Sequence, residues 1–158
     1  MIRLRFVTSN AESSRLIRLQ AGICMPFTPS HVEALSQDGK FYLGQHMEDG
    51  MQARPVGYDA KTMLAEKIVD LPCDQTTEDA FYAYVQSRIG APYDWESLIS
   101  FVDPAINLHD FNHLICSAEM TAGLRKSGYF HWPLTVPFHH ISPRDLFLIL
   151  SSHIEISH

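Results

Sequence analysis

A β-hairpin signal in the first third of the chain restricts the fold more than any other feature. Residues 31–36 and 40–45 are two short runs that contain apolar residues, and Gln37-Asp38-Gly39 separates them. An Asp-Gly pair between such runs favours a tight hairpin turn. We therefore expect two antiparallel strands here, with His31 at the start of the first strand.

Other segments add strands to this hairpin. Residues 2–8 alternate polar and apolar side chains, so they are predicted to form a strand with one apolar face. A short strand is also predicted around residues 51–54, whereas residues 61–71 fit either a helix or a strand. Residues Leu146–Leu150 are all apolar and are predicted to form a short strand inside a sheet.

Helices are predicted from capping residues and apolar periodicity. A weak short helix is expected from Ser9 or Asn10 to about Gln20, and another over 96–102. Stronger signals predict a helix from Thr76 or Thr77 to Ile89 and a helix from Cys116 to Lys126 that Gly128 ends. Together the elements predict one α+β domain over residues 1–158, with a mixed antiparallel sheet and helices.

Composition excludes several functional classes. The chain has 158 residues, of which 46% are hydrophobic and 19% charged, as in ordinary globular proteins. A net charge of −6 and a pI near 5.8 argue against nucleic-acid binding. No apolar run approaches the roughly 18 residues of a transmembrane helix. The N-terminal residues show no signal-peptide core, so a cytoplasmic location is expected, although a phage-associated or co-delivered protein needs no such signal either.

The cysteines and histidines do not form a recognisable metal motif. The three cysteines, Cys24, Cys73 and Cys116, contain no close pair, which favours reduced thiols. There are nine histidines, but neither an HExxH sequence nor paired CxxC sequences occur. No metal or other cofactor is therefore predicted. A GxSxG nucleophile motif and a glycine-rich phosphate loop are also absent from the sequence.

Cys116 and His31 are candidates for nucleophilic catalysis. A thiol reacts as the thiolate, which a helix N-terminus and a nearby imidazole both favour. Cys116 lies in the first turn of its predicted helix, and Glu33 lies on the same strand face as His31. A carboxylate in that position can orient an imidazole. From the residues alone, a buried helix cysteine and a solvent-facing polar strand edge are the favoured interpretations, and catalysis is the alternative.

Four segments together resemble a known family. These are the hairpin of residues 31–44, the Gly90-Ala-Pro-Tyr93 turn, the helix of residues 115–129, and Ser142-Pro143-Arg-Asp-Leu146. They are similar to the histidine hairpin, Gly-x-x-Tyr turn, nucleophile helix and Ser-Pro-x-Asp-Leu segment of the NlpC-type, papain-like cysteine peptidases. The histidine precedes the cysteine here, as in the circularly permuted YiiX-like and lecithin:retinol-acyltransferase-like branches. The resemblance covers roughly residues 28–150.

The resemblance implies a fold and a set of roles. It implies a permuted papain-like domain in which an antiparallel sheet or small barrel packs against helices, with the histidine hairpin before the cysteine helix. Cys116 would be the nucleophile and His31 its general base. Tyr93, Ser117 and Gln45 are candidates for substrate or oxyanion contacts, together with backbone N–H groups at the start of the helix.

The third catalytic residue is where this chain departs from the resemblance. Relatives often carry a polar orienting residue on the second hairpin strand, and the corresponding positions here hold Tyr42, Leu43 and Gly44. None of these can orient an imidazole as a carboxylate does. Glu33 is the predicted substitute, and Gln45 is the alternative.

The resemblance also implies a reaction. It points to a cysteine hydrolase of amide bonds, for example in cell-wall peptides, acting on a peptide or acyl-amide substrate in a bacterial or phage setting. An acyltransferase or thioesterase on lipid-like acyl groups is one alternative. A catalytically inactive binding module of a phage or bacterial assembly is another. The oligomeric state cannot be predicted from these residues.

Overall fold

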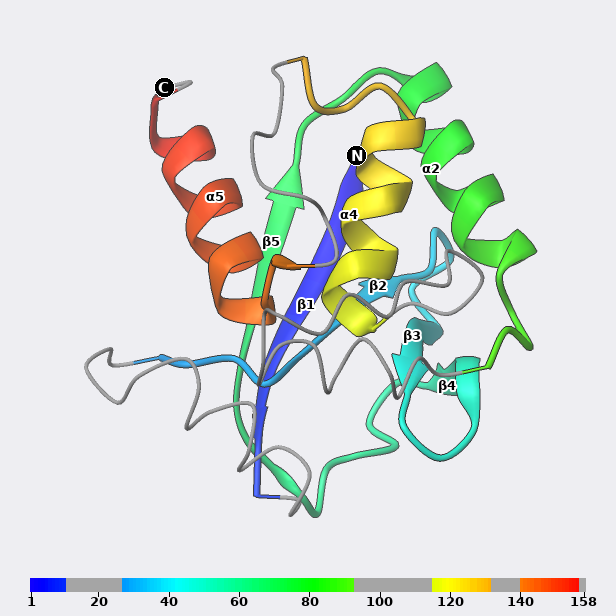
Figure 1. Ribbon diagram of the computed structural model, residues 1–158, viewed down its shortest axis with the longest axis vertical. Helices are drawn as coiled ribbons and strands as arrows, with labels where there is room; N and C mark the ends of the chain where they lie inside the picture. The colour runs from blue at the N-terminus through cyan, green and yellow to red at the C-terminus, as the bar shows by residue number, and fades with distance from the viewer. Residues whose placement is uncertain (11–26, 93–114, 132–139, 157–158) are drawn as a thin grey trace.

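The structure is a computed structural model, and it describes residues 1–10, 27–92, 115–131 and 140–156 (Figure 1). These residues form an α+β arrangement of a five-stranded antiparallel sheet and three helices, which confirms the α+β class predicted from the sequence. The helices predicted over 10–20 and 96–102 fall almost wholly outside the described residues. Cys24 and Tyr93 also lie outside them.

The sheet runs in the order β4-β3-β2-β1-β5. All paired strands are antiparallel, and β1 is an interior strand that lies between β2 and the edge strand β5. Residues 61–71, for which helix and strand were both possible, form β5. The strands are β1 (Ile2–Ser9), β2 (His31–Leu35), β3 (Phe41–His46), β4 (Gly50–Pro55) and β5 (Met63–Leu71).

The predicted hairpin is confirmed as β2 and β3. Its turn is closed by a backbone hydrogen bond in which Ser36 N donates to the Phe41 carbonyl at 2.8 Å. Gly39 has a φ of 72°, a conformation that glycine adopts without the steric cost of a side chain. The register pairs Ala34 with Leu43, and this register decides which residues face one another near the start of β2.

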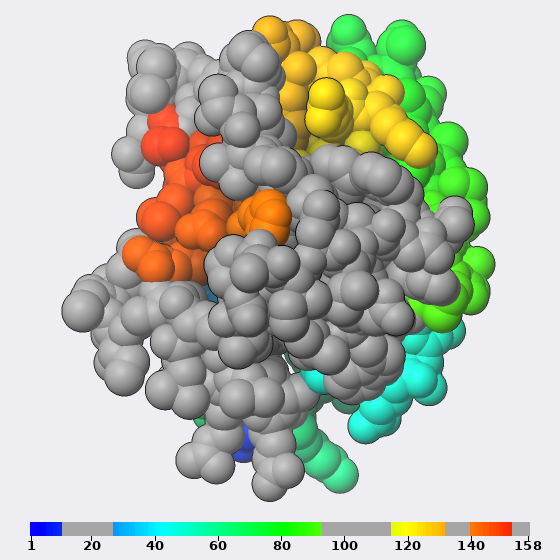
Figure 2. Space-filling view, viewed as in Figure 1, coloured from blue at the N-terminus to red at the C-terminus, as the bar shows by residue number. Residues whose placement is uncertain are grey.

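Within the described residues, three helices accompany the sheet: α2 (Gln75–Ser87), α4 (Cys116–Lys126) and α5 (Pro143–Ile156). In Figure 1, α4 and α5 lie in front of the sheet and α2 lies beside α4. In the space-filling view of the same face, α2 and α5 border opposite sides (Figure 2). The part of the chain that the structure describes has no helix long and apolar enough to cross a membrane.

The core fills the space between the sheet and these helices. The apolar side of β1 supplies fully buried Ile2, Leu4 and Phe6, because alternate residues of a strand face the same side. From α4 the core receives Cys116, Met120 and Leu124, which belong to the same buried cluster. The nucleophile candidate is therefore at the interface between helix and sheet.

The two strongest helix predictions are confirmed. Asp74 caps α2, since its carboxylate accepts a hydrogen bond from Thr77 N at 2.7 Å, a common N-cap arrangement. Helix α4 covers the predicted residues, and Gly128 follows it with a φ of 80°, as a glycine after a helix C-terminus often does.

The strand predicted at Leu146–Leu150 is wrong, because these residues lie within α5. Ser142 Oγ accepts a hydrogen bond from Asp145 N at 3.2 Å, and the Asp145 carboxylate accepts one from Ser142 N at 3.2 Å. This reciprocal pair is a capping box, and Pro143 fits the first helical position. Leu146 and Leu150, four residues apart, are both buried, so the apolar run serves one helix face.

Candidate active site

Cys116 is the first residue of α4. The preceding residue, Ile115, is extended and its side chain makes no capping hydrogen bond. The first amide groups of the helix thus have no side-chain cap at this N-cap position, and the positive end of the helix dipole lies at the thiol. The Cys116 residue is 3% exposed, so its sulfur lies close to the core.

His31 begins β2 and lies next to Cys116. Burial alone would lower the pKa of His31, but interactions with the Cys116 thiol group and the Glu33 carboxylate outweigh it and raise the pKa to about 10. The imidazole is therefore a cation at neutral pH, and it lies beside the Cys116 thiol group. The side chain of His31 remains 18% exposed, so this side of the pair has contact with solvent.

Glu33 lies two residues further along β2 and on the same strand face. Its Oε2 atom is 3.5 Å from His31 Nε2, and its side chain is fully buried. Burial would raise the pKa of Glu33, but His31 and Arg5 outweigh this and lower it. An ionised carboxylate thus faces the imidazole, as the orienting member of a catalytic triad does.

Arg5 of β1 holds Glu33 from the other side. One guanidinium nitrogen of Arg5 donates to Glu33 Oε1 at 2.7 Å, and the others donate to Glu66 Oε2 at 2.6 Å and Asp59 Oδ1 at 3.0 Å. Tyr58 also donates its hydroxyl to Glu33 Oε2 at 3.2 Å. Glu33 is therefore fixed by neighbours on both oxygens, while Oε2 still faces His31.

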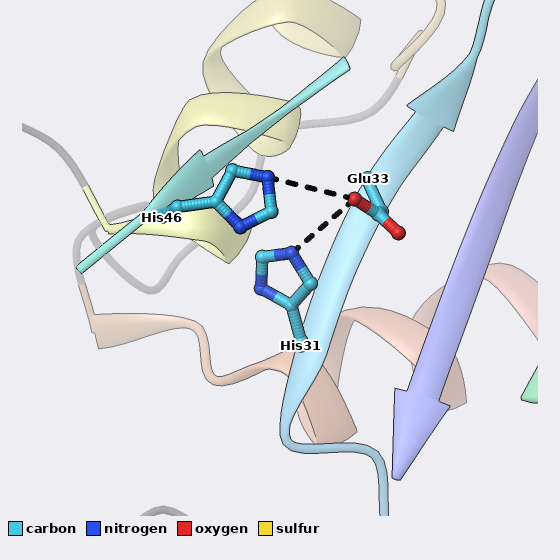
Figure 3. A group of neighbouring side chains, drawn as sticks. All are labelled: His31, Glu33 and His46. Atoms are coloured by element: carbon cyan, nitrogen blue, oxygen red, sulfur yellow. Dashed lines mark ion pairs between the residues drawn. The ribbon is translucent and has the colours of Figure 1, made fainter. Parts of the chain in front are cut away.

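His46 also belongs to this group, and the sequence interpretation missed it. Its Nε2 atom is 3.8 Å from Glu33 Oε2, and its ring centre is 5.1 Å from that of His31. Figure 3 shows both rings turned toward the Glu33 carboxylate. Burial lowers the pKa of His46, as does the charge on His31, to about 3. The neutral His46 contrasts with the cationic His31.

A signal for His46 was present in the hairpin register. The ladder pairs Ala34 with Leu43, and extending it in the same register brings His46 opposite His31. The prediction instead followed the spacing of the resembling family, which indicated positions 42–44. The orienting role predicted for Glu33 stays a prediction, with His46 as a second polar neighbour.

Gly44 provides the room that this cluster needs. A Cβ atom at Gly44 would lie 2.8 Å from Glu33 Cβ and 3.2 Å from Glu33 Oε2. It would also lie 3.4 Å from His31 Nε2. A side chain at this position would therefore displace the carboxylate from the imidazole.

The remaining predicted residues lie in different surroundings. Tyr93 is outside the described residues, so its position beside the thiol stays a prediction. Ser117 is fully buried, and its Oγ has no hydrogen-bond partner within the described ranges. Gln45 precedes His46 in β3, so the two side chains point to opposite faces of the sheet. The Nε2 atom of Gln45 donates a hydrogen bond to the Pro92 carbonyl at 2.6 Å. Gln45 thus points away from the His31–Glu33 face and is not placed to orient His31.

No relative of known function helps to assign a role to this site. No protein-family model matches the chain, and no curated protein matches its sequence. The functional argument therefore depends on the geometry of Cys116, His31, Glu33 and His46.

Proposed function

We propose that this protein is a cysteine hydrolase that cleaves amide bonds, with Cys116 as the nucleophile. One observation carries the proposal: the His31 imidazole interacts with both the Cys116 thiol group and the Glu33 carboxylate. An ordinary buried cysteine has no need of a histidine that a buried carboxylate keeps protonated. Such an arrangement is a thiolate–imidazolium pair with an orienting group.

The proposed reaction has two stages. The Cys116 thiolate attacks the carbonyl carbon of the amide, and amide groups at the start of α4 stabilise the oxyanion. The imidazolium of His31 gives its proton to the departing amine, which leaves a thioester on Cys116. Neutral His31 then takes a proton from water, whose oxygen attacks the thioester. The acid product leaves, and the thiolate–imidazolium pair is restored.

The order of the elements supports the permuted papain-like arrangement as part of the same proposal. The histidine hairpin of β2 and β3 precedes the cysteine helix α4, and α4 packs against both strands. The cysteine lies at the helix N-terminus and the histidine on a strand of an antiparallel sheet. These are the features that the resemblance implies for this family.

Alkylation tests the pair directly. Iodoacetamide treatment between pH 6 and 7, followed by peptide mass mapping, is expected to modify Cys116 quickly in the native protein. His31→Ala is expected to slow this modification at least tenfold, because the positive neighbour of the sulfur is gone. Cys73→Ser is the matched control, since Cys73 is a partly exposed thiol outside the pair.

An activated ester tests turnover. A p-nitrophenyl ester should transfer its acyl group to Cys116, visible as an added mass, and the thioester should then hydrolyse. No acylation of Cys116 and no effect of His31→Ala on its alkylation would contradict the proposal.

One observation favours a second function, a catalytically inactive binding module. Cys116 is 3% exposed and belongs to the main hydrophobic cluster, as a structural cysteine does. In that case Cys116 should resist iodoacetamide in the native protein at all pH values below 8. Cys116→Ala should then leave partner binding intact, because the thiol would only fill space.

A further inference from the structure

We propose that His31, Glu33 and His46 form a binding site for a divalent transition-metal ion of the Zn²⁺ type. One nitrogen of each histidine and one carboxylate oxygen lie within 4.8 Å of one another. Two imidazoles and a carboxylate are ligands that Zn²⁺ binds in proteins. This inference goes beyond the proposed hydrolase and does not depend on it.

The two distances from Glu33 to the histidine nitrogens are slightly longer than those between ligand atoms in a tetrahedral metal site. Glu33 Oε2 is 3.5 Å from His31 Nε2 and 3.8 Å from His46 Nε2. Ligand atoms about 2.0 Å from a tetrahedral metal are roughly 3.3 Å apart. The two separations to Glu33 are therefore within about 0.5 Å of the value expected in a tetrahedral site.

The two nitrogens are also poorly satisfied as they stand. His31 Nε2 and His46 Nε2 are both buried, and in the part of the chain that the structure describes neither makes a hydrogen bond of ordinary geometry; each has only the longer ion-pair contact with Glu33 Oε2. The His46 side chain is only 10% exposed, and Figure 3 shows its ring turned to the same oxygen as that of His31. Buried polar atoms without partners are uncommon, and two that converge on one carboxylate point to a ligand between them.

The surrounding charge favours a cation. The Arg5 guanidinium bonds to three carboxylates, those of Glu33, Asp59 and Glu66, so this network carries excess negative charge. Arg5 occupies Glu33 Oε1, which leaves Oε2 as the atom that faces the histidines. The guanidinium thus orients the third ligand without occupying it, as second-shell groups of metal sites do.

The site would have three protein ligands. Within the described residues, the Cys116 sulfur does not lie within 4.8 Å of all three ligand atoms, so it is not placed as a fourth. A tetrahedral ion would then hold water or another small ligand at its open position. An ion on His31 Nε2 would displace the proton that the imidazole holds at neutral pH, and this proton would pass to solvent. Because the ion would also take the place of the contact between His31 and Glu33, it would inhibit the proposed cysteine chemistry.

Calorimetric titration with ZnCl₂ tests the site in a Cys116→Ser background, where no thiol is present at position 116. One ion per chain is expected to bind. His46→Phe keeps a ring against Tyr58 and His31 but removes the ligand nitrogen, so the affinity should fall at least tenfold. His131→Phe is the matched control, because His131 is an exposed histidine that interacts with Asp74 and does not belong to the cluster. The affinity of this variant for Zn²⁺ should be unchanged.

Cobalt provides a second readout. Co²⁺ should give visible absorption typical of a tetrahedral site, and His46→Phe should lose it. His46→Asn replaces His46→Phe if thermal melting shows that the phenylalanine variant is unfolded. The proposal is overturned if neither folded His46 variant binds Zn²⁺ more weakly than its parent, or if His131→Phe weakens binding equally. If Cys116 of the native protein does not react with iodoacetamide but Zn²⁺ binds as expected, the hydrolase proposal is contradicted and the metal-site proposal is not.

Discussion

At the scale of single residues, two neighbouring histidines hold their protons very differently. Glu33 and the Cys116 thiol group raise the pKa of His31 to about 10, although burial opposes them. Burial and the charge on His31 lower the pKa of His46 to about 3. In metal-free protein, NMR titration should therefore show a protonated His31 ring at pH 8 and a neutral His46 ring at pH 5.

The signs of these two shifts set different stability windows. For His31 the folded state holds the proton more tightly, so its contribution to the free energy of unfolding is full below pH 6.5 and is lost as the pH rises toward 10. The contribution of His46 is full above pH 6.5 and is lost as the pH falls toward 3. Cys116→Ser should lower the pKa of His31, and a His31 that titrates near 6.5 in the native protein would contradict the pairing.

Gly44→Ala tests the fit of the cluster. The added Cβ would lie 2.8 Å from Glu33 Cβ, so Glu33 must shift away from His31. We expect a loss of about 1–3 kcal/mol in the free energy of unfolding, which is usual for overpacking, and slower alkylation of Cys116. Urea denaturation and the iodoacetamide assay measure the two effects. Ala53→Gly, on the adjacent strand β4, controls for a general weakening of the sheet and should leave alkylation unchanged.

The sequence predicted part of this cluster correctly. The period-two pattern of a strand was enough to bring Glu33 to the same face as His31, and the helix start placed Cys116 at an N-terminus. Arg5 was not predicted as a buried residue, because in a strand it alternates with core residues and so resembles a solvent-facing position. It is buried because β1 is an interior strand, between β2 and β5, and carboxylates from β2, β5 and Asp59 surround its guanidinium.

At the scale of elements, one ion pair fixes the helix that carries the cysteine. Glu119, one turn after Cys116, is fully buried and accepts a hydrogen bond from Arg88 Nε at 3.1 Å. Arg88 is the C-cap residue of α2, so the pair joins the end of α2 to the start of α4. The orientation of α4, the helix that carries Cys116, thus depends in part on a contact outside the sheet.

A double-mutant cycle measures this contact. Arg88→Ala leaves the Glu119 carboxylate buried without its guanidinium, so we expect a loss of about 3 kcal/mol in the free energy of unfolding. In a Glu119→Gln background the same change should cost less by about 1 kcal/mol or more, because no buried charge is then left unpaired. Equal costs in both backgrounds, measured by urea denaturation, would show that Arg88 acts through other neighbours.

Helix α5 shows why element type was harder to predict than element position. The apolar run of Leu146–Leu150 is too short for its periodicity to distinguish a buried strand from a helix face. The deciding information lies just before the run, in the capping box of Ser142 and Asp145 around Pro143. The hairpin was predicted correctly because its turn residues determine the local backbone conformation. The secondary structure of residues 146–150 depends instead on the elements that pack against them.

At the scale of the whole molecule, the two faces of the sheet carry different kinds of buried side chains. One face is apolar and packs against α4 and α5, and the other holds the charged network around Arg5. The guanidinium also stacks 4.2 Å from the centre of the Tyr42 ring. The network joins β1, β2 and β5, so it supports the sheet and the site together. Its geometry requires a planar group with several donors, which lysine does not provide.

Arg5→Lys should therefore cost more than an exposed Arg-to-Lys change. Lysine keeps the charge but cannot bond to three carboxylates at once or stack on Tyr42. We expect a loss of about 3 kcal/mol in the free energy of unfolding, and slower alkylation of Cys116 because Glu33 is no longer fixed against His31. Glu66→Gln is the control: the Glu66 side chain is 40% exposed, so removing its charge should cost less than about 1 kcal/mol. If Arg5→Lys matches this control in urea denaturation and leaves alkylation unchanged, the charged face does not position the site.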